Sequence, residues 1–171
     1  MGQIIAFPTA PAVPHLAANL GTADCILLLA IRWWAADFRL GIDPIPRLRD
    51  ALTHARACNA AILIDAFMSV VARTVRRPAT INGPRCPQLS ADEQQLLYAA
   101  SLTQDDQGKL AEKALRTALL SAEGAAFAVG ELEALGALFS QVCLFFGRRT
   151  SPAANPDNDS RTAWSPPAAW H

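Results

Sequence analysis

Charged residues are scarce in this chain. Only 18% of its 171 residues are Asp, Glu, Lys or Arg, and 51% are hydrophobic, whereas about 25% of an ordinary globular protein is charged. So little charge leaves much of the surface apolar, and a contiguous apolar surface usually marks an interaction site. We therefore expect a homo-oligomer or a protein partner.

A basic stripe is also missing. Arginine is in excess over residues 1–85, and acids are in excess over residues 86–135. This asymmetry can orient two protein surfaces, but it is weaker than the basic face of a nucleic-acid-binding protein. No nucleic-acid partner is expected.

Long hydrophobic runs are absent too. The best candidate, residues 25–38, is interrupted by Arg32 and Asp37 and is shorter than the roughly 20 residues that span a bilayer. Residues 1–14 have neither the basic start nor the apolar run of a secretory signal. We expect a cytoplasmic protein without a membrane span.

The motifs of common catalytic and metal sites are missing. There is no Gly-x-Ser-x-Gly nucleophile turn, no glycine-rich phosphate loop, and no Glu-x-x-His pair of a carboxylate metal site. The cysteines have no Cys-x-x-Cys spacing; they are Cys25, Cys58, Cys86 and Cys143. These absences predict a protein that is not an enzyme and that holds no metal and no cofactor.

What the chain does have is helical periodicity. Apolar residues recur at three- and four-residue spacing through residues 16–147. This pattern predicts an all-α protein, folded as an irregular bundle of five to six helices in a single domain.

Two terminal segments have a different composition. Residues 1–15 are predicted to be a Pro-rich arm, and residues 148–171 a disordered tail rich in Ser, Pro, Asn and Asp. Trp164 and Trp170 are unusual in such a tail, and the sequence leaves open whether they dock anywhere.

Capping and breaking residues predict where the helices begin and end. The first helix starts at residue 16 or 23, ends at Phe38, and is apolar almost all round, which places it in the centre of a bundle. Asp43-Pro44 predicts the start of a second helix, and Ser90 with Glu93 predicts a capping box. The next helix is predicted to end near residue 76, either as a separate third helix or as a continuation of the second. Two more helices are predicted over residues 106–121 and 123–146.

One stretch, residues 76–93, concentrates three arginines and three prolines around the predicted loop of residues 78–89, between two helical patterns. A guanidinium group matches phosphate or carboxylate, and the free amides at a helix start also favour an anion. The loop therefore predicts an anion site made of Arg76, Arg77, Arg85 and Ser90. The alternative is that the arginines only complement the helix dipole.

Cys86 lies beside Arg85 and a few residues before the helix that starts at Ser90. A nearby positive charge and a helix start favour the thiolate, so a reactive thiol at Cys86 is a further hypothesis, and an enzymatic protein would use it as nucleophile. The alternative is a small apolar side chain that packs between two prolines.

Five short motifs occur along the chain: Leu-Leu-Ala-Ile-Arg at 28–32, Arg-Arg-Pro at 76–78, Cys-Pro at 86–87, Ser-Ala-Asp-Glu at 90–93 and Leu-Leu at 96–97. Together they resemble an uncharacterised alphaproteobacterial family of small helical proteins, a domain of unknown function, over about residues 24–146. The resemblance implies a cytosolic, all-helical protein with no assigned activity. Members of that family have more cysteines near the Cys-Pro position, and the single Cys86 here argues against a metal role.

These observations favour a non-enzymatic helical interaction or regulatory protein that self-associates through apolar surface. The competing hypothesis is a protein that binds a small anionic ligand with the loop from Arg76 to Ser90.

Overall fold

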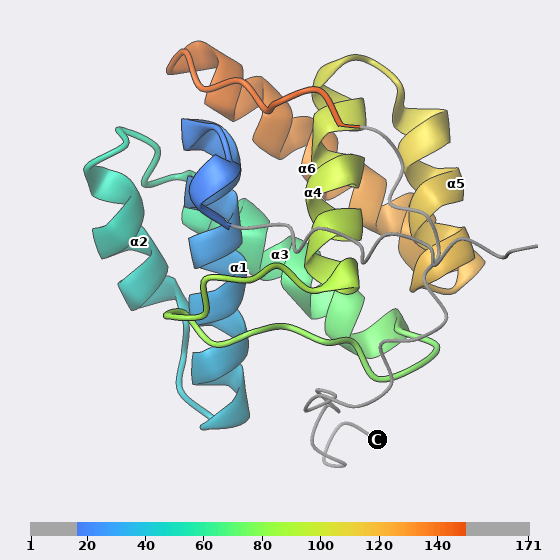
Figure 1. Ribbon diagram of the computed structural model, residues 1–171, viewed down its shortest axis with the longest axis horizontal. Coiled ribbons are helices and arrows are strands. Elements are labelled where there is room, and N and C mark those ends of the chain that lie inside the picture. Colours follow the sequence, from blue (N-terminus) through green and yellow to red (C-terminus); the bar gives the residue numbers. More distant parts are fainter. Residues whose placement is uncertain (1–16, 150–171) are drawn as a thin grey trace, which may run out of the picture.

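The computed structural model describes residues 17–149 and is helical (Figure 1). A short 3-10 helix, η1 (Ala17–Asn19), precedes six α-helices: α1 (Thr22–Arg39), α2 (Ile45–Thr53), α3 (Ala60–Thr74), α4 (Ala91–Gln104), α5 (Gly108–Ala118) and α6 (Ala122–Gln141). The predicted all-α class and the predicted number of helices are confirmed. Over residues 17–149 the structure has isolated β-bridges and no strand, and one of these bridges joins Val75 to Leu120.

The helices surround one hydrophobic core. α1 and α2 form one side of the molecule, α4, α5 and α6 form the other, and α3 packs against helices of both sides (Figure 1). Trp34, Phe67 and Phe139 are the largest apolar side chains that are fully buried. The loop of residues 75–90 runs across α1 and α3 before it enters α4 (Figure 1), and Arg39 at the end of α1 donates a 3.0 Å hydrogen bond to the carbonyl of Ile81 in this loop.

Local signals predicted two helix starts well. The Ser90 hydroxyl accepts a hydrogen bond from the Glu93 N–H at 3.0 Å, and the Glu93 carboxylate accepts one from the Ser90 N–H at 2.9 Å. The predicted capping box is therefore present. α2 begins one residue later than predicted, at Ile45, whose N–H donates to the Asp43 carboxylate at 3.0 Å.

The predicted end of the last helix at residue 146 is wrong. α6 ends at Gln141, and Cys143 adopts a positive φ of 58°, a backbone conformation that turns the chain out of the helix. Gln104 of α4 stabilises the turn, since its amide donates to the Leu144 carbonyl at 3.0 Å and accepts from the Phe146 N–H at 2.7 Å. Phe146 consequently folds back onto Phe139, with ring centroids 5.4 Å apart.

The predicted end of the third helix is also too late. α3 is separate from α2 and ends at Thr74, because the extended Val75 pairs with Leu120 and the Arg76 N–H donates to the Leu119 carbonyl at 2.9 Å. A tertiary pairing, and not Pro78 alone, therefore ends the helix.

The predictions for the terminal segments lie mostly outside the described residues. These are the Pro-rich arm of residues 1–15, the tail of residues 148–171, and the question whether Trp164 and Trp170 dock. Of that tail the structure describes Arg148 and Arg149, and the Arg149 guanidinium lies 3.2 Å from the Asp24 carboxylate of α1.

Two glycines of α6 give a matched test of the packing between α3 and α6. A Cβ added at Gly124 would overlap the Thr74 side chain, whereas a Cβ at Gly130 would meet nothing within 4 Å. We expect Gly124→Ala to lower the free energy of unfolding by about 1–3 kcal/mol through overpacking. Gly130→Ala should leave it unchanged or raise it by up to about 1 kcal/mol. Urea unfolding of both variants checks this, and equal effects would contradict the close approach of the two helices.

Candidate interaction surface

α1 has its charges on the inside. Three charged residues lie between Thr22 and Phe38, and all three are buried: Asp24, Arg32 and Asp37 are 0%, 2% and 1% exposed. Charged side chains are almost never fully buried unless they are paired. An ordinary surface helix exposes its charges, whereas α1 buries these three together with an apolar face that includes Leu27, Ile31 and Trp34.

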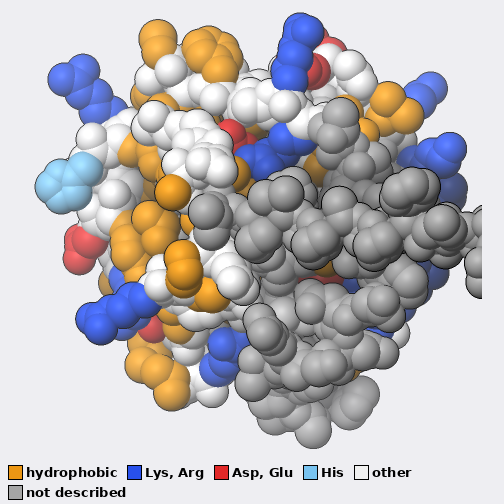
Figure 2. Space-filling model, viewed as in Figure 1, with side chains coloured by type: hydrophobic (Ala, Val, Ile, Leu, Met, Phe, Trp, Pro, Cys, Tyr) orange, Lys and Arg blue, Asp and Glu red, His pale blue; other side chains and the backbone are white. Residues whose placement is uncertain are grey.

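The outward face of α1 is apolar. Its side chains that are not buried include Ile26, Leu29, Trp33 and Ala36, and the Leu40 cap follows at the end of the helix. Leu29 is 37% exposed and Leu40 72%. We call these five residues the α1 stripe. Hydrophobic side chains gather on the side of the molecule formed by α1 and α2, beside the grey atoms in Figure 2.

The buried partner of Arg32 is Glu93 of α4. The guanidinium donates to both carboxylate oxygens, at 2.7 and 2.9 Å, and the two side chains are 1% and 0% exposed. Arg32 also donates to the carbonyls of Cys86 and Gln88, at 2.5 and 2.6 Å, and Glu93 accepts from the Asn82 N–H at 3.0 Å. The free-energy cost of desolvating such a pair is offset only by good geometry and further hydrogen bonds. The loop of residues 75–90 supplies those hydrogen bonds.

The other two buried carboxylates of α1 are paired as well. Asp24 accepts from the Gly147 N–H at 3.0 Å and from Arg149 at 3.2 Å, so it fixes the segment that follows α6. Asp37 lies 3.2 Å from the Arg47 guanidinium of α2. That second contact is an ion pair without an aligned hydrogen bond, because no donor is directed at Oδ1 of Asp37.

Two arginines of the predicted anion site, Arg76 and Arg77, bind different groups within the protein. Arg76 is exposed and donates to the carbonyls of Arg116 and Thr117, the latter at 3.2 Å, at the end of α5. Arg77 forms a two-pronged pair with Asp92, at 2.5 and 3.0 Å. Carbonyls at a helix end and carboxylates are the groups that guanidinium normally binds, so both arginines have structural roles.

The remaining predicted site residues are in the same loop. The Ser90 hydroxyl accepts from Glu93 and donates to the Thr80 carbonyl at 2.5 Å. Arg85 is exposed, and Cys86 is half-buried with its carbonyl bound to Arg32. Three of the four predicted anion ligands thus have partners inside the protein. An external anion stays a prediction that rests on Arg85, and the reactivity of Cys86 stays a prediction too.

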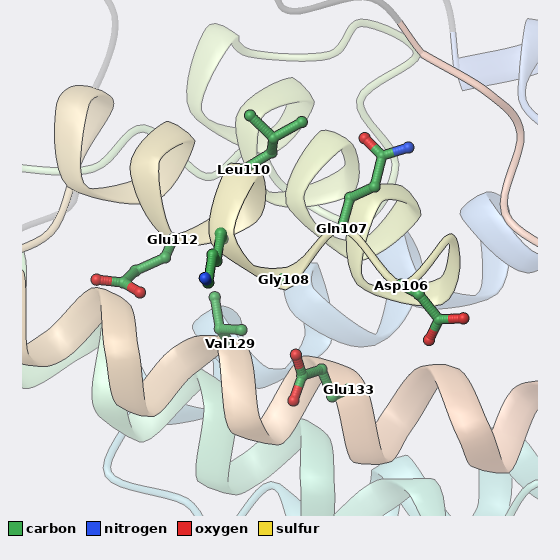
Figure 3. Close-up of a pocket in the computed structure, with 8 residues that line it drawn as sticks. Asp106, Gln107, Gly108, Leu110, Glu112, Val129 and Glu133 are labelled. Carbon is green, nitrogen blue, oxygen red and sulfur yellow. The ribbon is translucent and has the colours of Figure 1, made fainter.

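A surface cavity of about 470 Å³ lies between the start of α5 and α6 (Figure 3). Glu133 points from α6 toward Gly108, where a Cβ would collide with the Glu133 carboxylate. A carboxylate beside a helix start is stabilised by the helix dipole, so Glu133 contributes to the packing of α5 on α6. The cavity offers no Ser, Cys, Thr or His nucleophile, because its lining is Asp106, Gln107, Gly108, Lys109, Leu110, Glu112, Val129 and Glu133.

Searches for related proteins and for known site types add no assignment. No protein-family model, no curated protein and no solved structure matches the chain. Across residues 17–149, no group of three His, Cys, Asp or Glu side chains is arranged to hold a metal ion. Within the same range, no helix is both long and apolar enough to cross a membrane.

Sequence reasoning missed the α1 stripe. The periodicity indicated a helix that is apolar almost all round, and we expected it at the centre of the bundle. The available signal was the position of the charges. Asp24, Arg32 and Asp37 are separated by eight and five residues, which spreads them around more than half of the helix circumference, and the α1 stripe occupies the uncharged sector between Arg32 and Asp37.

Glu93→Gln should test the buried pair, because it keeps the shape of the side chain but leaves the Arg32 charge buried without its counter-ion. Removal of one partner of a buried pair costs about 3–5 kcal/mol in the free energy of unfolding. The control is Arg148→Gln, whose ion pair with Asp105 is exposed on both sides and which should cost about 1 kcal/mol or less. Urea unfolding measures both, and a smaller loss for Glu93→Gln than for the control would contradict the assignment.

Thiol labelling should follow burial. Burial raises the pKa of the Cys25 thiol above its ordinary value, and the neighbouring Asp24 carboxylate raises it further. The Arg149 guanidinium lowers the pKa, but by less than burial and Asp24 raise it. A raised pKa keeps the thiol protonated at neutral pH, so alkylation of Cys25 should be slow and should accelerate as the pH rises. Cys58 and Cys143 are exposed and should be modified first. Peptide mapping by mass spectrometry gives the order; early modification of Cys25 would contradict it, and Cys86 reacting ahead of both exposed thiols would support a reactive Cys86.

Proposed function

We propose that this protein is a non-enzymatic interaction protein, with a structural or regulatory role, that binds another protein chain through the α1 stripe. One observation carries the proposal: all charges of α1 before Arg39 are buried, and the residues left on its outer face are uncharged. A contiguous exposed apolar surface often marks a site of protein interaction.

The energetics of α1 support the same conclusion. Fully burying a leucine side chain contributes about 1.5–3 kcal/mol to the free energy of unfolding. The monomer would gain this contribution if Leu29 faced its core. In this protein the inward positions of α1 are held by Arg32, which pairs with Glu93 of α4, and by buried apolar residues such as Leu28 and Trp34. The apolar contribution of the stripe is therefore available to a partner chain instead of the monomer's own core.

The composition of the stripe also fits protein recognition. Protein interfaces are depleted of charge at their centre and enriched in aromatic residues, Trp among them. Trp33 lies half-buried in the middle of the stripe, where a partner can cover the rest of its ring. Buried tryptophans near the centre of an interface are frequent energetic hot spots.

Site-specific photo-crosslinking in the native cell tests the proposal. A photoreactive phenylalanine analogue at position 29 lies in the stripe. The same analogue at position 127 replaces Phe127, which lies on α6 and is 70% exposed. We expect position 29 to give one discrete crosslinked protein, identified by mass spectrometry, and position 127 to give none. Crosslinks from position 29 no more defined than those from position 127 would refute the proposal.

A further inference from the structure

The segment that follows α6 folds back onto the protein. Residues 144–149, which we call the strap, form neither helix nor strand, and they run from the end of α6 past the start of α1 and the end of α4 (Figure 1). Leu144 packs against the core and Phe146 is buried, whereas Phe145 between them is 63% exposed. Successive side chains of an extended chain point to opposite sides, so this part of the strap lies on the helices as an extended peptide.

Two polar side chains bind the backbone of the strap. The Gln104 amide donates to the Leu144 carbonyl at 3.0 Å and accepts from the Phe146 N–H at 2.7 Å. The Asp24 carboxylate accepts from the Gly147 N–H at 3.0 Å. When a protein recognises an extended peptide, hydrogen bonds to the peptide backbone provide affinity, and contacts with its side chains provide specificity. The helices bind the strap in the same manner.

The Asp24 carboxylate depends on the strap for its partners. Asp24 is 0% exposed, and within residues 17–149 both groups that donate to its carboxylate belong to the strap. These are the Gly147 N–H and the Arg149 guanidinium, which lies at 3.2 Å. A buried carboxylate without partners is costly. The start of α1 therefore carries a charged group that is suited to a segment with a free N–H and a positive charge two residues later.

Three positions of the strap define the chemistry of a matching ligand. The ring of Phe146 lies against Phe139 of α6, with the centroids 5.4 Å apart. A Cβ at Gly147 would lie 3.2 Å from a carboxylate oxygen of Asp24, so glycine fits best at that position. Arg149 supplies the positive charge, and the side chain between Gly147 and Arg149 is 93% exposed and unrestricted. The site thus matches the sequence aromatic-Gly-x-Arg.

The local sequence opposes the bound conformation of the strap. Apolar residues continue at helical spacing beyond the end of α6, through Phe146, yet the chain leaves the helix at Cys143. The φ of Cys143 is 58°, which is unfavourable for a residue with a Cβ. The contacts with Asp24 and Gln104 hold the strap against this preference. Without them α6 could continue as a helix, so the same residues have two competing conformations.

We infer that Asp24, Gln104 and Phe139 form a peptide-binding site for a segment of a partner protein with the sequence aromatic-Gly-x-Arg, and that the strap blocks this site from within the chain. Only two residues join α6 to the strap, so the strap competes at a high effective concentration. A partner segment binds only the fraction of molecules in which the strap is open. This site shares no residue with the α1 stripe and goes beyond the proposed function.

Binding of a fluorescently labelled synthetic peptide to the purified full-length chain tests the inference. The peptide is Leu-Phe-Phe-Gly-Arg-Arg, the sequence of the strap, and fluorescence anisotropy gives its dissociation constant. The variant Phe146→Ala with Arg149→Ala weakens the strap but keeps the site, and it should bind the peptide at least about tenfold more tightly than the wild type does. The matched control, Phe145→Ala with Arg148→Ala, changes the outward neighbours and should bind like the wild type. Circular dichroism verifies that both variants are folded.

Substitutions in the peptide test the chemistry of the site without any effect on the fold of the protein. The receptor is the chain with Phe146→Ala and Arg149→Ala. Alanine at the peptide position equivalent to Phe146 or to Arg149 should weaken binding by about tenfold or more, because each loses a contact with a buried group. Alanine at the position equivalent to Phe145 or to Arg148 should change binding by less than about threefold, because exposed contacts contribute little.

The outcomes separate this inference from the proposed function. A peptide that binds neither chain, or binds the wild type and the variant with the weakened strap equally well, overturns the blocked site. Equal losses within the Phe145 and Phe146 pair and within the Arg148 and Arg149 pair would indicate binding through general hydrophobicity and charge, and would also overturn it. Crosslinking from position 29 does not involve this site, so its result decides the proposed function independently.

Discussion

The buried pair of Arg32 and Glu93 is the interaction on which the rest of this structure depends. It joins α1 to α4 across 61 positions of the chain, and its spare hydrogen-bonding groups are bound by the loop of residues 75–90. Because Arg32 must point inward, the rotation of α1 about its own axis is fixed. The apolar residues that flank Arg32 on its outer side, Leu29 and Ala36 among them, then face outward. A buried ion pair is weak evidence of stability as such; here it specifies which face of α1 is exposed.

Local sequence signals predicted the helices and some of their ends, because those features depend on residues close together in the chain. The capping box at Ser90 is one example, and the start of α2 near Asp43 is another. The ends of α3 and α6 depend on distant residues. Val75 pairs with Leu120, and Gln104 binds the turn that contains Leu144 and Phe146. A single sequence gives no sign of such pairings, so both helices were predicted too long.

The candidate site was predicted in part for the same reason. From the sequence we expected the loop before α4 to bind an anion, since guanidinium groups and the free amides of a helix start occur there. In the structure, Asp92 and Glu93, the last two residues of the Ser-Ala-Asp-Glu motif, provide carboxylates to that loop. The exposed face of α1 was not predicted, because an almost fully apolar helix with three charges is compatible with burial on every side. Only the positions of Glu93 and Arg149 in space show which side the charges take.

The contacts of Asp24 also determine where the described chain comes together. Asp24, near the start of α1, binds Gly147 and Arg149, more than 120 positions further along, so both ends of the described chain lie beside the first turn of that helix. A circularly permuted chain could therefore keep this fold. It would have a short linker between residues 149 and 17 and new termini elsewhere, for example between α2 and α3. Anything fused to either end would be carried near the start of α1.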